Sequence, residues 1–230
     1  MPVETWGSAG ETLVFLPGLG CAPRDYRPGL EALSAELRIV VPDLSFRGLT
    51  PLPHVIDEYL TVVGAIASEM APGAPWSGHS FGALLAMLHS GDAIALAPSI
   101  PADVSFPRTF GRALWKQTRQ CVGFDGAGAI RFGWRIAADY VATAAIRPRS
   151  LFPILGDLKR TPADLPPRSR RTIVYLCRRD ELYRQREYEL WLETAERSLD
   201  VVEVPEGHDW PVTHPDAFAE RILESVRTLG

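Results

Sequence analysis

The chain has 230 residues, of which 46% are hydrophobic and 23% charged, and these proportions are typical of a folded domain with a substantial core. Its net charge of -4 argues against a nucleic-acid partner, and its three scattered cysteines (Cys21, Cys121 and Cys177) fit neither a disulfide framework nor a zinc site. The N-terminus lacks the features of a signal peptide and no apolar run is long enough to span a bilayer, so we expect reduced, buried thiols in a cytoplasmic protein.

Short apolar runs alternate with longer amphipathic stretches along the chain. In chain order, the predicted elements are a weak strand at 3–6, a strand at 12–16, a helix at 26–37, a strand at 38–41, a helix at 55–70, a short strand at 74–77, a helix at 81–89, strands at 93–97 and 172–177, a helix at 185–197, a strand at 200–204 and a helix at 215–229. The first helix is predicted from the spacing of Leu30, Leu33 and Leu37. Pro75 predicts a very short strand at its position, because proline cannot donate a hydrogen bond to a sheet. The alternation predicts an α/β fold with a mostly parallel sheet flanked by helices.

The regular alternation stops between residues 101 and 171, where the composition also changes. This segment contains 13 Lys+Arg, 5 Asp+Glu and eight aromatic residues, whereas the rest of the chain contains 11 basic and 23 acidic residues. A basic, aromatic insertion between two strands of a sheet predicts a small helical lid. We therefore predict a core domain formed by residues 1–100 and 172–230, with a lid (cap) formed by residues 101–171.

The run Gly78-His79-Ser80-Phe81-Gly82 matches the G-x-S-x-G pattern and lies between the short strand and a predicted helix. In this motif the serine occupies a strained turn that lifts its hydroxyl above the sheet. Side chains two residues before and after it would collide, which explains a glycine at both places. We predict that Ser80 is a nucleophile, and that the following helix directs its N-terminal amides at the reaction centre.

A serine hydroxyl needs a base, and the base needs an orienting acid. Among five histidines, His208 is favoured because it follows the last predicted strand, at the edge where the carboxyl ends of the strands gather. His214 precedes the proline that starts the last helix, which favours helix capping as its role. Asp180 follows the preceding strand at the same edge, and it completes the chain order nucleophile, acid, base. Glu181 beside it and Asp103 after an earlier strand stay open as alternatives for the acid.

An oxyanion hole needs two backbone N–H groups aimed at the developing negative charge. One is expected from Phe81, directly after the nucleophile. The other is expected from the loop Pro17-Gly18-Leu19-Gly20 at the end of the strand 12–16, and within it we choose Leu19. The glycines of this loop let the backbone approach a substrate closely. Acyl transfer by these groups requires no metal and no cofactor.

Together these motifs resemble those of the α/β-hydrolase superfamily, and the similarity extends over nearly the whole chain. It is carried by four stretches: 13–20, 41–48, 78–82 and 207–218. Two departures are Pro75-Trp76, where relatives have small or aliphatic residues, and Cys177, where glycine is common. The resemblance implies eight strands, with the N-terminal pair shortened here and the lid inserted between the sixth and seventh strands. It also implies acyl transfer, because dehalogenases and epoxide hydrolases of this fold have an aspartate in place of Ser80.

We therefore expect hydrolysis of a small-molecule carboxylic ester through an acyl-enzyme, as in a carboxylesterase. The main alternative is a thioesterase or an esterase of carrier-linked acyl groups, because the predicted lid can offer cations to phosphates or to an acidic carrier. The cations with helical spacing are Arg108, Arg112, Lys116 and Arg119, which can instead face solvent or pair with the acidic core domain. Carbon–carbon bond hydrolysis uses the same triad, and non-catalytic ligand binding is the alternative of another class. The sequence specifies neither the acyl group nor the oligomeric state.

Overall fold

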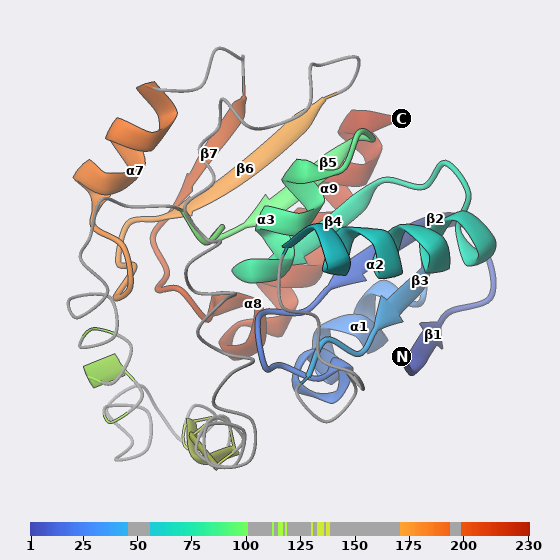
Figure 1. The fold of residues 1–230 in the computed structure, drawn as a ribbon, viewed down its shortest axis with the longest axis horizontal. Coiled ribbons are helices and arrows are strands. Elements are labelled where there is room, and N and C mark those ends of the chain that lie inside the picture. The colour runs from blue at the N-terminus through green and yellow to red at the C-terminus, as the bar shows by residue number, and fades with distance from the viewer. Residues whose placement is uncertain are drawn as a thin grey trace.

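A mostly parallel sheet runs through the centre of the molecule (Figure 1). The computed structural model describes residues 1–45, 56–100, 171–193 and 199–230, and the positions 112, 115, 116, 118, 130, 133–135, 137 and 138 between them. In these residues the sheet has the strand order β1-β3-β2-β4-β5-β6-β7. The strands are β1 (Val3–Trp6), β2 (Glu11–Leu16), β3 (Leu37–Pro42), β4 (Trp76–His79), β5 (Ala93–Leu96), β6 (Thr172–Cys177) and β7 (Asp200–Val204). β1 is antiparallel to β3, and every other neighbouring pair is parallel.

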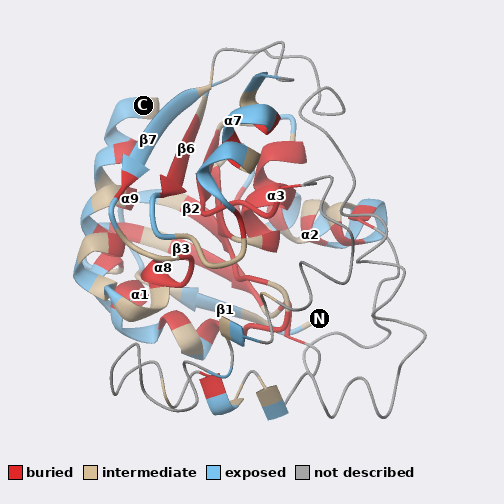
Figure 2. Cartoon of the chain, turned by 90° about the vertical axis from the view of Figure 1, so that its left-hand side faces the viewer, coloured by how far each residue is buried: buried red, intermediate tan, exposed pale blue. Residues whose placement is uncertain are grey.

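Helices cover both faces of the sheet. One face is covered by α2 (Ile56–Met70), α3 (Phe81–Leu88) and α7 (Gln185–Glu193). The other face is covered by α1 (Arg27–Leu33), α8 (Trp210–Thr213) and α9 (Pro215–Leu229), together with the short 3-10 helix η1 (Pro23–Tyr26). Leu13 and Phe15 of β2 belong to the core under α1 and α9, whereas Val14 and Leu16 belong to the core under α2 and α3. Because successive strand residues face opposite sides, a strand covered on both faces is apolar at every position. Figure 2 shows this buried centre and the exposed outer surface of α9.

The predicted sheet is confirmed at most strands. Six strands begin and end within one residue of their predicted bounds, and the strand predicted at 74–77 is observed two residues later, as β4. Pro75 explains the shift, because its carbonyl accepts a hydrogen bond from Val14 but it has no N–H, so the ladder continues only from Trp76. As predicted, this strand is very short.

Two predictions about the N-terminal half are wrong. The helix predicted at 26–37 ends at Leu33, because Leu37 begins β3 and pairs with Glu11. Leu37 still packs in the same core as Leu33, so its side chain is buried from a strand instead of from a helix. Residues 1–10 form the one strand predicted at 3–6, followed by a turn in which Gly7 and Gly10 have positive φ, so the described residues form seven strands where the resemblance implies eight. Residues 101–171 therefore follow the fifth observed strand, not the sixth.

Little of the predicted lid is described, and its boundaries lie outside the described residues. The described positions between 101 and 170, which we call the lid segment, are all helical. Trp115 and Trp134 in this segment are mostly exposed. Among the residues that the structure describes, no helix is both long and apolar enough to cross a membrane.

Candidate active site

Ser80 lies at a sharp turn between β4 and α3, with φ 54° and ψ -114°. Such a positive φ in a residue with a side chain costs on the order of 1–3 kcal/mol, and surrounding hydrogen bonds must hold it. The Ser80 N–H donates to the carbonyl of Leu96 (2.9 Å), and its carbonyl accepts from the N–H groups of Leu84 (3.2 Å) and Ser99 (3.0 Å). These bonds come from β5, α3 and the loop after β5, so the turn is fixed from three sides.

The two elbow glycines are required by close backbone packing. A Cβ on Gly78 would lie 2.3 Å from the carbonyl carbon of Gly82, and a Cβ on Gly82 would lie 2.1 Å from the carbonyl oxygen of Leu16. Real Cβ atoms do not approach backbone atoms this closely, so a side chain at either position would push the turn apart. The same packing brings the loop that follows β2 against the elbow, because the Gly82 Cβ would also meet the Pro17 carbonyl oxygen at 2.6 Å.

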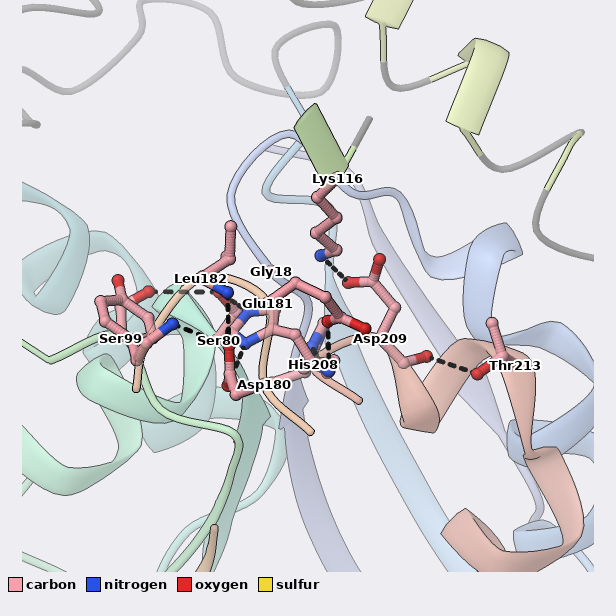
Figure 3. Close-up of polar contacts among 12 residues, drawn as sticks. Gly18, Ser80, Ser99, Lys116, Asp180, Glu181, Leu182, His208, Asp209 and Thr213 are labelled. Atoms are coloured by element: carbon pink, nitrogen blue, oxygen red, sulfur yellow. Dashed lines mark hydrogen bonds and ion pairs between the residues drawn. The ribbon is translucent and has the colours of Figure 1, made fainter. Parts of the chain in front are cut away.

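His208 reaches Ser80 from the loop after β7 (Figure 3). Its Nε2 lies 2.9 Å from the Ser80 Oγ, and its Nδ1 lies 2.8 Å from the Asp180 Oδ2. The His208 side chain is only 2% exposed. Its backbone N–H donates to the Glu181 carboxylate (3.1 Å), so the loop is also held from the end of β6. The structure therefore joins a hydroxyl, an imidazole and a carboxylate in one hydrogen-bonded line.

The side chain of Asp180 is buried completely, and four donors surround its carboxylate. The N–H groups of Leu182 (2.8 Å) and Tyr183 (3.0 Å) donate to Oδ1, while the Tyr188 hydroxyl (2.7 Å) and the His208 ring meet Oδ2. Burial opposes ionisation of this group, but the facing imidazole and the hydrogen bonds outweigh burial and hold the pKa of Asp180 below its ordinary value. An ionised carboxylate beside Nδ1 keeps the ring proton there, which leaves Nε2 able to accept a proton from the serine.

The alternative acids and bases occupy other places. Glu181 binds the backbone of His208 and not its ring, whereas Asp103 and His54 lie outside the described residues. His89 stacks on the ring of Trp76 at a centroid distance of 3.9 Å. His214 stands at the N-cap position of α9, but its side chain makes no capping hydrogen bond, so the predicted capping role is wrong. Its ring instead lies 2.9 Å from the hydroxyl of the preceding threonine.

The two amides expected to bind an oxyanion lie beside the elbow. α3 begins at Phe81, so the Phe81 N–H belongs to the first turn, whose amides have no acceptor within the helix. Leu19 lies in the loop after β2, which packs against Gly82 of the same helix. One amide therefore belongs to the first turn of α3 and the other to the loop after β2, and both lie at the carboxyl edge of the sheet beside Ser80.

Several residues around the site were not singled out from the sequence. The Ser99 hydroxyl lies 3.1 Å from the Ser80 Oγ, and it follows β5 at the same edge of the sheet, which is a sequence feature that can point to it. Tyr188 binds the Asp180 carboxylate from α7, and Tyr26 binds the ring of His79 from η1. Both are buried aromatic residues, and nothing in the local sequence distinguishes them from ordinary core residues.

His79 is buried beside the triad and is held in its neutral form. Its Nδ1 lies 2.7 Å from the Tyr26 hydroxyl, and its Nε2 lies 2.9 Å from the backbone carbonyl of His208. Burial, followed by the nearby His208, lowers the pKa of His79 to about 3. Both ring nitrogens are engaged, so His79 is not a candidate for the catalytic base.

The burial of His79 predicts that stability falls with acidification. Unfolded histidine binds a proton below about pH 6.5, whereas folded His79 binds one only near pH 3, so the unfolded state holds more protons between these values. The free energy of unfolding should therefore fall by about 1.4 kcal/mol per pH unit through this window because of this one group. Urea unfolding at several pH values measures the slope. The slope of the free energy of unfolding against pH should be smaller by about 1.4 kcal/mol per pH unit in His79→Gln than in the wild-type protein, and unchanged in the exposed control His214→Gln. Equal slopes in the two variants would contradict the prediction.

Three cations of the lid segment bind carboxylates of the core. Lys116 Nζ lies 2.7 Å from the Asp209 Oδ1 (Figure 3), Arg112 lies 2.8 Å from Glu187, and Arg135 is paired with Asp25. The side chains of these pairs are at most 21% exposed. Pairing with the acidic core is one of the three roles that the sequence leaves open for the cations of this segment. The structure shows this pairing for Arg112 and Lys116, whereas Arg108 and Arg119 lie outside the described residues.

Lys116→Met should lower the free energy of unfolding by on the order of 3 kcal/mol, because Asp209 would lose the cation that offsets its burial. Burial raises the pKa of Asp209, but Lys116, with smaller contributions from His208 and His79, more than offsets burial, and the pKa lies well below its ordinary value. The stabilisation is thus present above about pH 3.9 and is lost as the pH falls through the folded value. Chemical denaturation at pH 7 checks the first statement, and a series of pH values downward from pH 4 checks the second. The matched control Arg227→Met breaks an exposed ion pair with Glu36 and should cost under about 1 kcal/mol.

One group of side chains in the described part of the chain has the composition of a metal site. Ligand atoms of His79, His208 and Asp209 lie within 4.8 Å of one another. However, Lys116 occupies the Asp209 carboxylate, and both nitrogens of each histidine ring lie within hydrogen-bond distance of other groups. These possible ligand atoms already contact other groups of the protein, so the cluster does not fit a cation.

Comparisons with known proteins agree with this architecture. A search of curated proteins found no match. Solved structures with the same fold include a thioesterase domain from the curacin biosynthetic pathway (18% identity, 96% of this chain and 94% of the other, TM-score 0.70) and the carboxylesterase CesB from Bacillus subtilis (15% identity, 96% and 85%, TM-score 0.71). The enol-lactonase from Burkholderia xenovorans is also similar (13% identity, 97% and 95%, TM-score 0.68). At these identities the structures show a common fold. The model of the alpha/beta hydrolase family matches residues 13–221, and the chain belongs to this family.

Proposed function

We propose that this protein hydrolyses a carboxylic ester through an acyl-enzyme on Ser80. The observation that carries the proposal is the line of hydrogen bonds from the Ser80 Oγ through His208 to the buried Asp180. A nucleophile within hydrogen-bond reach of a base, with the base oriented by a third group, is the arrangement that activates a serine hydroxyl. These groups lie at the carboxyl edge of the sheet, where open α/β folds bind their ligands.

In the first half of the reaction, the Ser80 Oγ attacks the ester carbonyl carbon while its proton passes to the Nε2 of His208. The negative charge that develops on the carbonyl oxygen is stabilised by the N–H groups of Leu19 and Phe81. The tetrahedral intermediate then breaks its bond to the alkoxy oxygen, which takes the proton from Nε2 and leaves as an alcohol. Asp180 stays ionised throughout and stabilises the imidazolium that forms between these two transfers.

In the second half, a water molecule takes the place of the alcohol. His208 accepts one proton from the water as the water oxygen attacks the acyl carbon. When the second tetrahedral intermediate breaks its bond to the Ser80 oxygen, the Nε2 of His208 returns the proton to that oxygen and the acid leaves. The net reaction consumes one ester and one water, and it yields one acid and one alcohol. Every proton is carried by groups of this chain or by water, so the mechanism uses no metal and no cofactor.

Two assays of the wild-type protein test the proposal. A fluorophosphonate probe should label Ser80, and this should be located by peptide mass spectrometry. A panel of p-nitrophenyl esters of increasing acyl length should show turnover and define the acyl group that the site accepts. Absence of both labelling and turnover would overturn the proposal and favour a non-catalytic ligand-binding role.

A thioesterase acting on carrier-linked acyl groups is the second candidate, and the fold shared with the curacin thioesterase domain is compatible with it. This candidate depends on cations that are available to an acidic carrier. Arg112 and Lys116 instead bind core carboxylates, which favours a neutral ester. Comparing matched ester and thioester substrates, with and without a phosphopantetheine group, distinguishes the two. A KM that rises with salt only for the carrier substrate would support the thioesterase.

A further inference from the structure

Three loops around Ser80 are joined by one chain of hydrogen bonds. The Gly18 N–H donates to the Tyr26 hydroxyl oxygen (3.0 Å), which lies 2.7 Å from the Nδ1 of His79, and the Nε2 of His79 lies 2.9 Å from the backbone carbonyl of His208. Gly18 belongs to the loop after β2, His79 immediately precedes the nucleophile, and His208 lies in the loop after β7. A single imidazole therefore connects the loop of the expected oxyanion donor with the loop of the expected base.

Only one arrangement of protons satisfies the whole chain. The carbonyl oxygen of His208 can only accept, so the Nε2 of neutral His79 must carry the proton. Nδ1 is then an acceptor, and the Tyr26 hydroxyl must donate to it. The hydroxyl oxygen in turn accepts from Gly18, which can only donate through its N–H. Because each donor meets an acceptor, the network fixes the tautomer of His79 and the direction of the Tyr26 hydroxyl.

Gly18 is held at both its backbone groups. Its N–H is bound to Tyr26, and its carbonyl accepts from the Cys21 N–H at 2.9 Å. In a trans peptide the N–H of the next residue points opposite to the carbonyl of the preceding one, so fixing the Gly18 carbonyl also fixes the direction of the Leu19 N–H. A Cβ on Gly18 would lie 3.3 Å from the His79 Nδ1 and 3.4 Å from the Tyr26 hydroxyl, so the backbone lies directly against this pair.

We propose that Tyr26 and His79 are positioning residues, which hold the Leu19 amide in register with Ser80 and His208. This inference rests on the proposed function, because it assigns a purpose to the oxyanion loop of that reaction. Tyr26 and His79 are 1% and 2% exposed, and their rings meet edge to face at a centroid distance of 5.8 Å. A buried pair of this kind can hold the loop in place before substrate binds, and such preorganisation makes the donors effective in the transition state.

Tyr26→Phe tests the inference with the smallest change, since it removes one hydroxyl and keeps the ring. We expect kcat on a short-chain ester to fall by about 10- to 100-fold, with KM changed by less than about threefold. The inhibition constant of a trifluoromethyl ketone, which forms an oxyanion-like adduct, should rise by the same factor as kcat/KM falls. The matched control is Tyr175→Phe, which removes a buried hydroxyl that is bonded to Ser225 at 2.8 Å on α9. It should keep kcat within about twofold.

Two substitutions of His79 separate the halves of the network. Asparagine offers an acceptor near the Nδ1 position and keeps the link to Tyr26, whereas glutamine offers a donor near the Nε2 position and keeps only the link to His208. His79→Gln should therefore lower kcat as Tyr26→Phe does, and His79→Asn should lower it less. The double variant Tyr26→Phe/His79→Gln should be no slower than Tyr26→Phe, because both changes break the same bond.

The outcomes separate this inference from the proposed function. A folded Tyr26→Phe protein with unchanged kcat and unchanged affinity for the trifluoromethyl ketone would overturn the positioning role while leaving the triad intact. If Tyr26→Phe does not fold, equal loss of activity in His79→Asn and His79→Gln would overturn it. Absence of turnover in the wild-type protein would instead overturn the proposed function, and with it this inference.

Discussion

Ser80→Ala should lower kcat on a short-chain ester by about 10⁶-fold, since it removes the atom that forms the acyl-enzyme in the proposed mechanism. The hydroxyl that it deletes lies 2.9 Å from the Nε2 of His208. The amides expected to bind the oxyanion would remain, so the variant should retain about 10³-fold catalysis above the reaction in water. Steady-state kinetics measure the loss, and mass spectrometry after rapid quenching should detect an acyl adduct on the wild-type protein and none on the variant.

Ser77→Ala is the matched control for this prediction. Ser77 is a fully buried serine on β4, three residues before the nucleophile, and its hydroxyl has no hydrogen-bond partner among the described residues. The control variant loses the same atom as Ser80→Ala, from the strand that leads into the elbow, and leaves Ser80 unchanged. Its kcat should stay within about twofold of the wild-type value. Retention of full activity by Ser80→Ala would refute the nucleophile assignment, whatever the control shows.

The sheet and the elbow could be predicted because their determinants are local. A strand covered on both faces is apolar at consecutive positions, as in Leu13 to Leu16, and a run of this kind is visible without any tertiary information. The elbow is equally local, since Gly78 and Gly82 must lack side chains to let one turn form. Parallel strands place all their carboxyl ends at one edge, so Asp180 and His208 could be expected near Ser80 although 100 residues or more separate them from it in the sequence.

Boundaries were harder to predict where two elements use the same apolar residue. Leu37 continues the helical spacing of Leu30 and Leu33, and it faces the same core from the first position of β3. A leucine can bury its side chain in that core from a helix or from a strand, so the spacing alone does not decide where the helix ends. Strand pairing decides where the helix ends, because Leu37 pairs with Glu11 of the neighbouring strand.

The residues that support the triad could not be predicted, because their roles depend on contacts between distant segments. Tyr26 and His79 are 53 residues apart, and each has the sequence character of an ordinary core residue. Lys116 is a basic residue of the predicted lid, and the sequence leaves open whether it faces a ligand, solvent or the core. Only its position beside Asp209 shows that it offsets a buried carboxylate next to His208.

Asp180→Asn should lower kcat by about 10⁴-fold while leaving the fold and KM nearly unchanged. Reaction rates over a range of substrate concentrations measure both constants, and ¹⁵N NMR of the imidazole reports which ring nitrogen carries the proton. The matched control is Asp200→Asn, an aspartate at the start of β7 whose side chain is 55% exposed. The control should behave like the wild-type protein. A loss below about tenfold in Asp180→Asn would exclude this residue as the orienting acid.

The size of this effect follows from the donors that surround the carboxylate. The N–H groups of Leu182 and Tyr183 both donate to Oδ1, so the asparagine must keep its oxygen at that position. Its NH₂ group then replaces Oδ2 and faces the Nδ1 of His208 as a donor, where the wild-type carboxylate is an acceptor. The ring can meet a donor only by moving its proton to Nε2, and that nitrogen then presents N–H to Ser80 instead of a lone pair. A base in this tautomer cannot take the serine proton, so the isosteric amide removes catalysis without removing a single heavy atom from the site.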